Sequence, residues 1–211
     1  MRHKRLLGIL GVAALLTAAA LAVASADAVT LCRVNENPTC SEENSYRVPT
    51  LFAAELERTT SATFSGTPSV TCGESWGSGE TTVAGTPLIG ESSNVNFASC
   101  GGCTTVEAQN LPWVGEVEAT GGGNGTLTAY GASKTNLSVK LTSCLSGATC
   151  FYGVESATAE IEGGESAKFT IVKVLNREPG SNKLLCATTS TFTGNYRLTT
   201  PTEPVFISAL P

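Results

Sequence analysis

The stretch NLSVKLTSC, residues 136–144, alternates apolar and polar side chains with a period of two residues. The apolar side chains belong to Leu137, Val139 and Leu141, and the polar ones to Ser138, Lys140 and Thr142. Successive side chains of a β-strand point to opposite faces, so one face of this segment is apolar and buried and the other is polar and exposed to solvent. The pattern therefore predicts a half-buried β-strand.

Comparable short segments recur along the chain between glycine and proline residues. They lie at 69–75, 93–100, 104–111, 115–120, 125–131, 158–164, 167–175, 188–200 and 204–210. The sequence GGGNG at 121–125 is typical of the turn of a β-hairpin. About ten short strands with such frequent turns predict an all-β fold, an antiparallel β-sandwich or jelly-roll-like single domain.

The segment PTLFAAELERTT, residues 49–60, has a composition that favours a helix. Its Phe52, Ala54 and Leu56 nevertheless occupy every second position, and two threonines follow. Alternation of this kind is a strand pattern, so we expect a strand here as well.

Residues 1–28 have the layout of a secretory signal peptide. Three basic residues among the first five precede an apolar run at 6–24, and small residues then allow cleavage after Ala26 or Ala28. An apolar run of this length is also nearly long enough to span a bilayer, but the small residues that follow it favour cleavage. We expect a single mature domain at 29–211 that is secreted, extracellular or cell-wall associated and has no membrane contact after cleavage.

The charge and the amino-acid composition of the mature chain argue against several partners and activities. The 211 residues include 13 Lys and Arg, 18 Asp and Glu, and one His. Loss of the signal would remove three basic residues, Asp27 and His3, which leaves 10 basic and 17 acidic residues and a net charge of −7. An acidic domain does not suit nucleic acid. Without histidine it cannot form a Ser-His-Asp or Cys-His site, and without aspartate it lacks a typical calcium loop.

Eight cysteines follow the signal segment, namely Cys32, Cys40, Cys72, Cys100, Cys103, Cys144, Cys150 and Cys186. An even number in an exported chain predicts four disulfides. Cys100 and Cys103 form a C-x-x-C motif, but no Lys, Arg or His lies within 30 residues of either to stabilise a thiolate. We therefore expect a structural role for the cysteines, with no redox, metal or cofactor site.

The spacing of the cysteines favours three local bridges. The close pairs are Cys32–Cys40, Cys100–Cys103 and Cys144–Cys150, and their closure would leave Cys72–Cys186 as a long-range bridge. The two glycines between Cys100 and Cys103 would supply the backbone freedom of a tight loop. Eight cysteines allow 105 pairings, so this set is a preference based on distance along the chain.

Two sets of residues are candidates for contact with a ligand. Trp76 lies in GESWGSGETT, which we expect to be a polar, glycine-rich loop. An exposed ring there would stack on a sugar or anchor a protein, unless it folds back onto the edge of the sandwich. Glu116 with Glu118, and Glu160 with Glu162, alternate along predicted strands, so each pair points to one side. Paired carboxylates serve glycosidases, although glutamates on the wet face of a strand are ordinary.

Several short motifs resemble a group of exported, uncharacterised actinobacterial Cys-rich β-proteins with an LPW motif. They are LCRVNENPTC, VTCGES, FASCGGCTTVEAQNLPW, SCLSGATCFYG and YRLTTPTEPVFIS. The cysteines and the LPW turn are also similar to the PraB type of secreted protein. The resemblance implies an exported β-sandwich and transfers no catalytic residue.

These observations lead to one main functional hypothesis and two alternatives. We expect a secreted or cell-surface structural or interaction protein without catalysis, whose partner is a polysaccharide or protein of the wall or matrix. The first alternative is a carbohydrate-binding module that uses Trp76. The second is a glycosidase-like enzyme that uses one of the glutamate pairs.

Overall fold

The segment that predicts a strand around residue 140 forms β9 (Leu137–Thr142), and its Leu137, Val139 and Leu141 side chains are buried. The computed structural model describes residues 28–36 and 38–210. The expected signal segment at 1–28 lies outside the described residues, apart from Ala28. The two helices in the described ranges are single 3₁₀ turns, η1 (Ala132–Lys134) and η2 (Leu145–Gly147), and no helix there could span a membrane.

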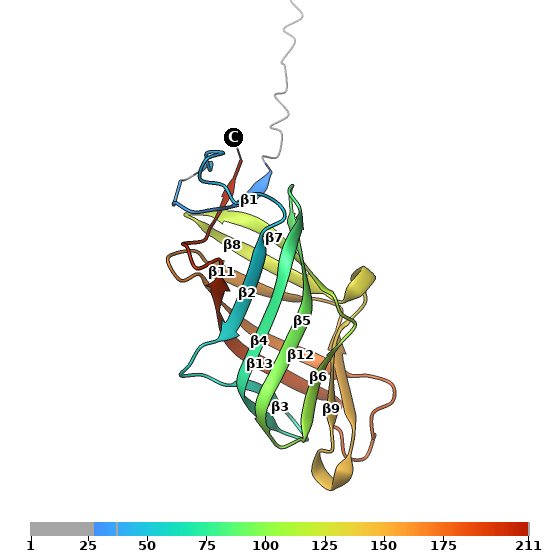
Figure 1. Cartoon of the computed structure of the whole chain (residues 1–211). Helices are drawn as coiled ribbons and strands as arrows, with labels where there is room; N and C mark the ends of the chain where they lie inside the picture. Colours follow the sequence, from blue (N-terminus) through green and yellow to red (C-terminus); the bar gives the residue numbers. More distant parts are fainter. Residues whose placement is uncertain (1–27, 37, 211) are drawn as a thin grey trace, which may run out of the picture.

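Eight antiparallel strands form a closed ring, which we call the upper ring (Figure 1). In order around the ring they are β4 (Val70–Val83), β5 (Leu88–Gly101), β7 (Trp113–Gly121), β8 (Asn124–Tyr130), β11 (Ala157–Glu162), β12 (Lys168–Arg177), β13 (Thr189–Thr200) and β2 (Leu51–Leu56). Closure of the sheet leaves this ring without a free edge strand.

Four of these strands continue into a second closed ring, the lower ring. There β4, β5, β12 and β13 are joined by β3 (Ala62–Ser65), β6 (Thr105–Gln109), β9 and β10 (Cys150–Val154). The pairing runs from β5 through β6, β9 and β10 to β12, and from β13 through β3 to β4. Figure 1 shows β3, β6 and β9 towards one end of the body and β7, β8 and β11 towards the other.

The length of the shared strands explains why the fold is a barrel. Strands β4 and β5 have 14 residues each, β13 has 12 and β12 has 10, so each has room for different partners at its two ends. The all-β, antiparallel prediction is confirmed. The expected β-sandwich or jelly roll is wrong, because the sheet closes on itself through these strands and does not split into two packed layers.

A two-stranded ribbon covers the upper ring. It consists of β1 (Val29–Cys32) and β14 (Phe206–Ala209), which pair antiparallel with Val29 opposite Ala209. All four residues of β1 are buried, and Leu31 and Ile207 reach the interior of the barrel. The ribbon therefore closes the end of the barrel that lies at the top of Figure 1.

The lower ring is filled by side chains. Phe64, Leu141 and Tyr152 are fully buried there. The ring of Phe64 lies 4.9 Å from that of Phe192 and 5.6 Å from that of Phe97, measured between centroids. Offset and edge-on contacts of this kind are favourable for aromatic side chains, so this end of the barrel has a solid core.

The four disulfides differ from the expected set in three of their pairs. The structure contains Cys32–Cys40, as the spacing suggested, together with Cys72–Cys100, Cys103–Cys144 and Cys150–Cys186. The predicted bridges Cys100–Cys103, Cys144–Cys150 and Cys72–Cys186 are wrong. Strand pairing is the physical reason, because it places Cys72 directly opposite Cys100, and it brings Cys103 next to Cys144 through the pairing of Thr105 with Thr142.

Three local predictions can be compared directly with the strands. Residues 51–56 of the helix-like segment form strand β2, as the alternation predicts. The GGGNG turn joins β7 to β8, with Gly122 and Gly123 at positive φ values of 65° and 85°. The polar segment around Trp76 is not a loop, since β4 runs through it without interruption from Val70 to Val83.

Candidate functional site: an apolar cavity inside the barrel

A cavity of about 260 Å³ lies inside the barrel. Its wall consists mainly of aliphatic and aromatic side chains, which include Leu31, Val117, Leu127, Ile161, Phe169 and Ile207. Eight-stranded barrels have an interior that is either filled by side chains or just wide enough for one small ligand. This barrel does both, because the lower ring is filled while the space beneath the β1–β14 ribbon is not.

The cavity exists because four inward positions on neighbouring strands carry very small side chains. Gly90 of β5 pairs with Gly115 of β7, Gly115 pairs with Ala129 of β8, and Ala129 pairs with Ala157 of β11. All four residues line the cavity. A row of larger side chains at this level would occupy the space, so the row sets where the cavity lies.

One buried hydrogen bond crosses the wall of the cavity. Ser75 Oγ on β4 lies 3.0 Å from Tyr196 Oη on β13, and the Tyr196 ring stacks on Phe169 with 5.4 Å between centroids. Burial raises the pKa of Tyr196 to about 12, although the bond to Ser75 opposes this shift. Tyr196 is therefore neutral at physiological pH, and its hydroxyl already has Ser75 as a hydrogen-bond partner.

Lys173 is the only charged residue among the described residues that line the cavity. It alternates along β12 with Val172 and Val174, which face outwards, and it shares its face with the core residues Ile171 and Leu175. Its side chain is partly exposed. The wall thus presents one cation and no anion to the interior.

The barrel wall has an unpaired seam next to Lys173. On the edge of β12 that faces away from β13, Phe169 pairs with Ile161 of β11, and Arg177 pairs with Tyr152 of β10. Residues 170–175 between these points have no strand partner on that edge among the described residues. Continuation of the β11–β12 register would place Ala157 opposite Lys173, so the seam lies at the level of the cavity.

A depression of about 560 Å³ lies on the outer surface near this seam. Its polar border includes Glu57, Glu160, Glu162 and Lys168. Thr158, Ala159 and Phe169 line both the depression and the inner cavity. The wall between the outside and the cavity is therefore thin at this place.

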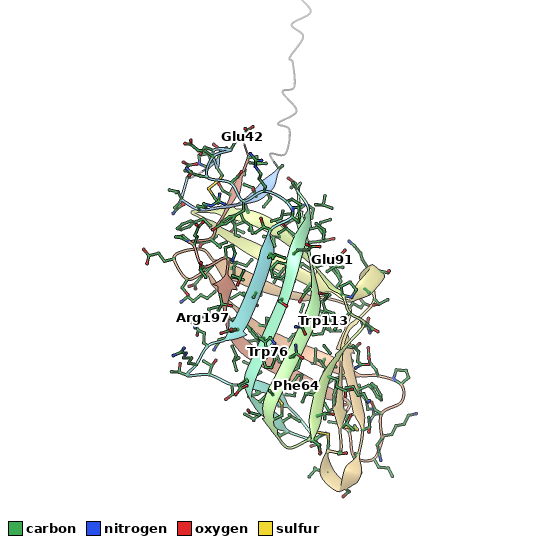
Figure 2. All side chains as sticks on the ribbon, in the orientation of Figure 1. Glu42, Phe64, Trp76, Glu91, Trp113 and Arg197 are labelled. Carbon is green, nitrogen blue, oxygen red and sulfur yellow. A yellow bond between two sulfur atoms is a disulfide. The ribbon has the colours of Figure 1, made fainter. Side chains whose placement is uncertain are left out.

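Trp76 lies in the middle of β4, as Figure 2 shows, with 37% of its surface exposed. Its neighbour Ser75 points into the barrel, so the Trp76 side chain belongs to the outer face. There it sits between Glu55 of β2 and Asn96 of β5 in the strand register. Of the two alternatives for this ring, exposed or folded back onto an edge, the structure has the exposed one, but the ring lies on the convex outside of a barrel and not in a loop.

The glutamate pairs also lie on the outer face. Glu116 is bound to Lys134, with 2.7 Å between Oε1 and Nζ, and Glu162 to Lys168, with 3.0 Å between Oε2 and Nζ. Glu160 and Glu162 border the outer depression, where the only aromatic residue of the lining is Phe169, whose ring stacks on Tyr196 in the core. No described aromatic ring is thus placed beside this pair to hold a sugar.

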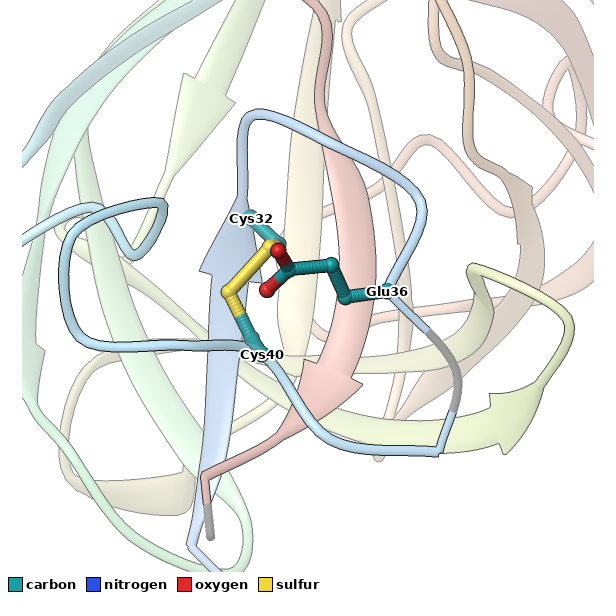
Figure 3. Close-up of side chains that lie close together, drawn as sticks. All are labelled: Cys32, Glu36 and Cys40. Carbon is teal, nitrogen blue, oxygen red and sulfur yellow. A yellow bond between two sulfur atoms is a disulfide. The ribbon is translucent and has the colours of Figure 1, made fainter.

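Cys32, Glu36 and Cys40 converge near the ribbon, as Figure 3 shows. The two sulfurs are bonded to each other, so neither is a thiolate ligand. The Glu36 carboxylate accepts hydrogen bonds from the Ser41 backbone N–H at 2.6 Å and from Asn44 Nδ2 at 2.7 Å. These bonds lower the pKa of Glu36, with the Ser41 backbone bond as the largest cause. The carboxylate thus orders the loop that the disulfide closes.

Comparison of the chain with family models, with curated proteins and with solved structures finds no match. The resemblance to exported actinobacterial β-proteins stays a prediction. The cavity and its surroundings are therefore the features of the molecule that bear on its function.

The sequence reasoning did not identify the residues of this cavity. Strand patterns place Gly115 and Ala129 on predicted strands and Ala157 one residue before another, but only the pairing of four strands shows that these residues form one row with Gly90. Lys173 lies in a segment whose two faces both carry apolar residues, so alternation alone does not say which face is inside. The one available signal was the presence of small residues at positions where a filled core would need large ones.

Proposed function

We propose that this protein is an exported, non-catalytic binding protein that holds a small apolar molecule inside its barrel. The observation that carries the proposal is the cavity of about 260 Å³ with its almost wholly apolar wall. Ligand sites are usually concave, mostly apolar and largely preformed, and this one has all three properties.

The physical chemistry of the wall favours an apolar occupant over water. A buried water needs two to four polar partners, whereas the hydroxyls of Ser75 and Tyr196 already bond to each other. An apolar molecule in the same place would remove its surface from water and gain contacts with the aliphatic and aromatic side chains around it. The cavity is therefore better suited to a hydrocarbon-like ligand than to a sugar or a hydrated ion.

The place of action that we propose is outside the cell. Four disulfides are typical of proteins that fold in an oxidising compartment, and all eight cysteines in the chain take part in them. The sequence pattern of residues 1–28 supports export by the general secretory route. A partner in the wall or matrix would meet the outer face, where Trp76 is exposed.

A fluorescent probe tests the proposed function. N-phenylnaphthylamine is uncharged and fluoresces strongly only in apolar surroundings, so we expect enhanced, blue-shifted emission that saturates with one site per chain. Ala129→Phe places a large ring in the row of small residues and should abolish the enhancement. The matched control is Thr128→Phe on the same strand, whose side chain points outwards.

The two outcomes of this test are distinct. Loss of the signal in A129F but not in T128F, with both variants folded by circular dichroism, supports a ligand in the barrel. Equal signals in the wild type and A129F would place the probe elsewhere and contradict the proposal. Since a phenyl ring can overfill the space, Ala157→Leu provides a second and milder block at the neighbouring position in the row.

A further inference from the structure

Lys173 has surroundings that are unusual for a lysine. It lies on the inward face of β12 between Ile171 and Leu175, and it pairs across the strand register with Phe192 of β13. Three other lysines, by contrast, form ion pairs with glutamates on the outer face, namely Lys134, Lys140 and Lys168. Within residues 28–36 and 38–210, no hydrogen bond or ion pair is formed by the Lys173 ammonium group.

This arrangement leaves a positive charge at the border of an apolar cavity without a counter-charge from residues 28–36 and 38–210. Desolvation of a charge is costly unless the charge is paired and hydrogen-bonded. An anionic group supplied by a ligand would provide that pairing, and a charge-assisted hydrogen bond at a partly dry site is stronger than one in water.

We propose that the cavity takes a single-chain amphiphile with a carboxylate head, such as a fatty acid, whose tail fills the apolar space and whose head binds Lys173. This inference rests on the proposed function, since it needs an apolar ligand in the barrel. The single positive charge matches the single negative charge of a carboxylate. A phosphate monoester carries nearly two negative charges at neutral pH and would leave one of them unpaired.

The seam gives such a ligand its orientation. Residues 170–175 of β12 lack a strand partner, within the part of the chain that the structure describes, on the side that faces β10 and β11, and Lys173 lies within this stretch. A head group at Lys173 would therefore stay near the solvent, while the tail would extend along the row of Gly90, Gly115, Ala129 and Ala157.

Two exposed valines lie on the outer face of β12 at the seam, beside the polar border of the outer depression. Val172 and Val174 are exposed by 61% and 53% on the outer face of β12, on either side of Lys173 in the sequence. Exposed valines next to an opening into an apolar cavity provide a first contact for the tail of the ligand.

The test compares two ligands that differ only in the head group. Dodecanoate and dodecanol have the same chain length, and their binding to the purified chain can be measured by competition with N-phenylnaphthylamine below their aggregation concentrations. We expect the wild type to bind dodecanoate roughly tenfold more tightly than dodecanol, because a hydrogen bond to a charged group contributes more than one to a neutral group. In Lys173→Met this preference should disappear, because the carboxylate loses its charged partner.

Two control variants separate the role of this lysine from a general charge effect. Lys173→Arg keeps the charge and should keep the preference for dodecanoate. Lys140→Met removes a cation from the outer face, where Lys140 pairs with Glu107 at 3.3 Å, and should also leave the preference unchanged. Loss of the preference in K140M to the same extent as in K173M would contradict a specific role for Lys173.

The failure of the inference differs from the failure of the proposed function. Equal affinities for dodecanoate and dodecanol in the wild type would overturn the role of Lys173 but leave an apolar site in the barrel. Absence of binding by both ligands and by the probe would overturn the proposed function itself. Tighter binding of dodecyl phosphate than of dodecanoate would contradict the assignment of a carboxylate head.

Discussion

Tyr196 and Ser75 place a hydrogen bond inside a wall that is otherwise largely apolar. Their oxygens lie 3.0 Å apart, and Ser75 is 4% exposed. Neither hydroxyl could be buried there without cost unless it had a partner. This pair fixes β4 relative to β13 across the barrel.

The ionisation of Tyr196 should make stability fall at alkaline pH. Burial raises the pKa of Tyr196 to about 12 in the folded protein, against about 10 in the unfolded chain. Its contribution is therefore fully present below pH 10 and is lost as the pH rises towards 12, by about 2–3 kcal/mol of unfolding free energy. Urea denaturation of the wild type and of Tyr196→Phe at pH 8, 10 and 12 measures this loss.

The Y196F variant isolates the contribution of this one residue. It should be less stable than the wild type at pH 8 by about 1 kcal/mol, because Ser75 loses its partner. The difference should shrink or reverse between pH 10 and pH 12, since phenylalanine does not ionise. A difference that stays constant over this range would show that Tyr196 does not titrate with a raised pKa.

Single residues also show where sequence reasoning reached its limit. Trp76 was expected in a loop because glycines and polar residues surround it, yet the same residues form a continuous strand when β2 and β5 pair on either side. Strand propensity depends strongly on the neighbouring strands, so a polar, glycine-rich stretch can be a strand in the centre of a sheet. The sequence left open whether the Trp76 ring is exposed or folded back, and it did not indicate a place on a convex surface.

At the scale of the strands, the seam along β12 separates two kinds of backbone amide. Those that face β13 are hydrogen-bonded along residues 168–176, whereas those that face the seam at 170–175 have no strand partner in the described ranges. Solvent-exposed amides without a hydrogen bond exchange rapidly.

Hydrogen exchange should therefore alternate along the middle of β12. We expect slow and fast exchange at successive residues of 170–175, measured by NMR on the unliganded protein. Residues 125–129 of β8 serve as the control, because this segment pairs with both β7 and β11 and should be slow throughout. Uniformly slow exchange along 170–175 would show that the seam is closed in solution.

The disulfides close loops of different length. Cys32–Cys40 closes a loop with a sequence separation of 8, whereas Cys103–Cys144 spans 41 residues. In the loop-entropy account, removal of the first bridge costs about 2.5 kcal/mol and removal of the second about 4 kcal/mol. Denaturation of the double variants Cys32→Ala/Cys40→Ala and Cys103→Ala/Cys144→Ala compares them, and a larger loss in the first would contradict this order.

The pairing of the cysteines could not be read from their spacing, because it follows from strand register. Cys100 and Cys103 are close in sequence, but Cys100 lies on β5 opposite Cys72 of β4, whereas Cys103 lies between β5 and β6 and bonds to Cys144 just after β9. The number of bridges, in contrast, followed from the even count of cysteines and the signal-like N-terminus. Local patterns thus predicted the strands and the count of disulfides but not which strands would meet.

For the molecule as a whole, closure of the sheet is the property that the sequence did not reveal. Alternation in β9 and in β2 correctly indicated strands, whereas the 14-residue strands β4 and β5 were expected as shorter pieces. Those long strands let one end of the barrel be filled while the other contains a cavity. A cavity depends on which small residues become neighbours, and that information is non-local.

The ribbon of β1 and β14 has a consequence for the order in which the protein can be completed. Val29 at the start of the domain pairs with Ala209 near its end, and β14 is the only strand partner of β1 among the described residues. During synthesis or export, β1 must wait until residues 206–209 have left the ribosome or the translocation channel. A chain interrupted before that point would keep the three disulfides of its lower ring within reach, yet its upper end would stay open.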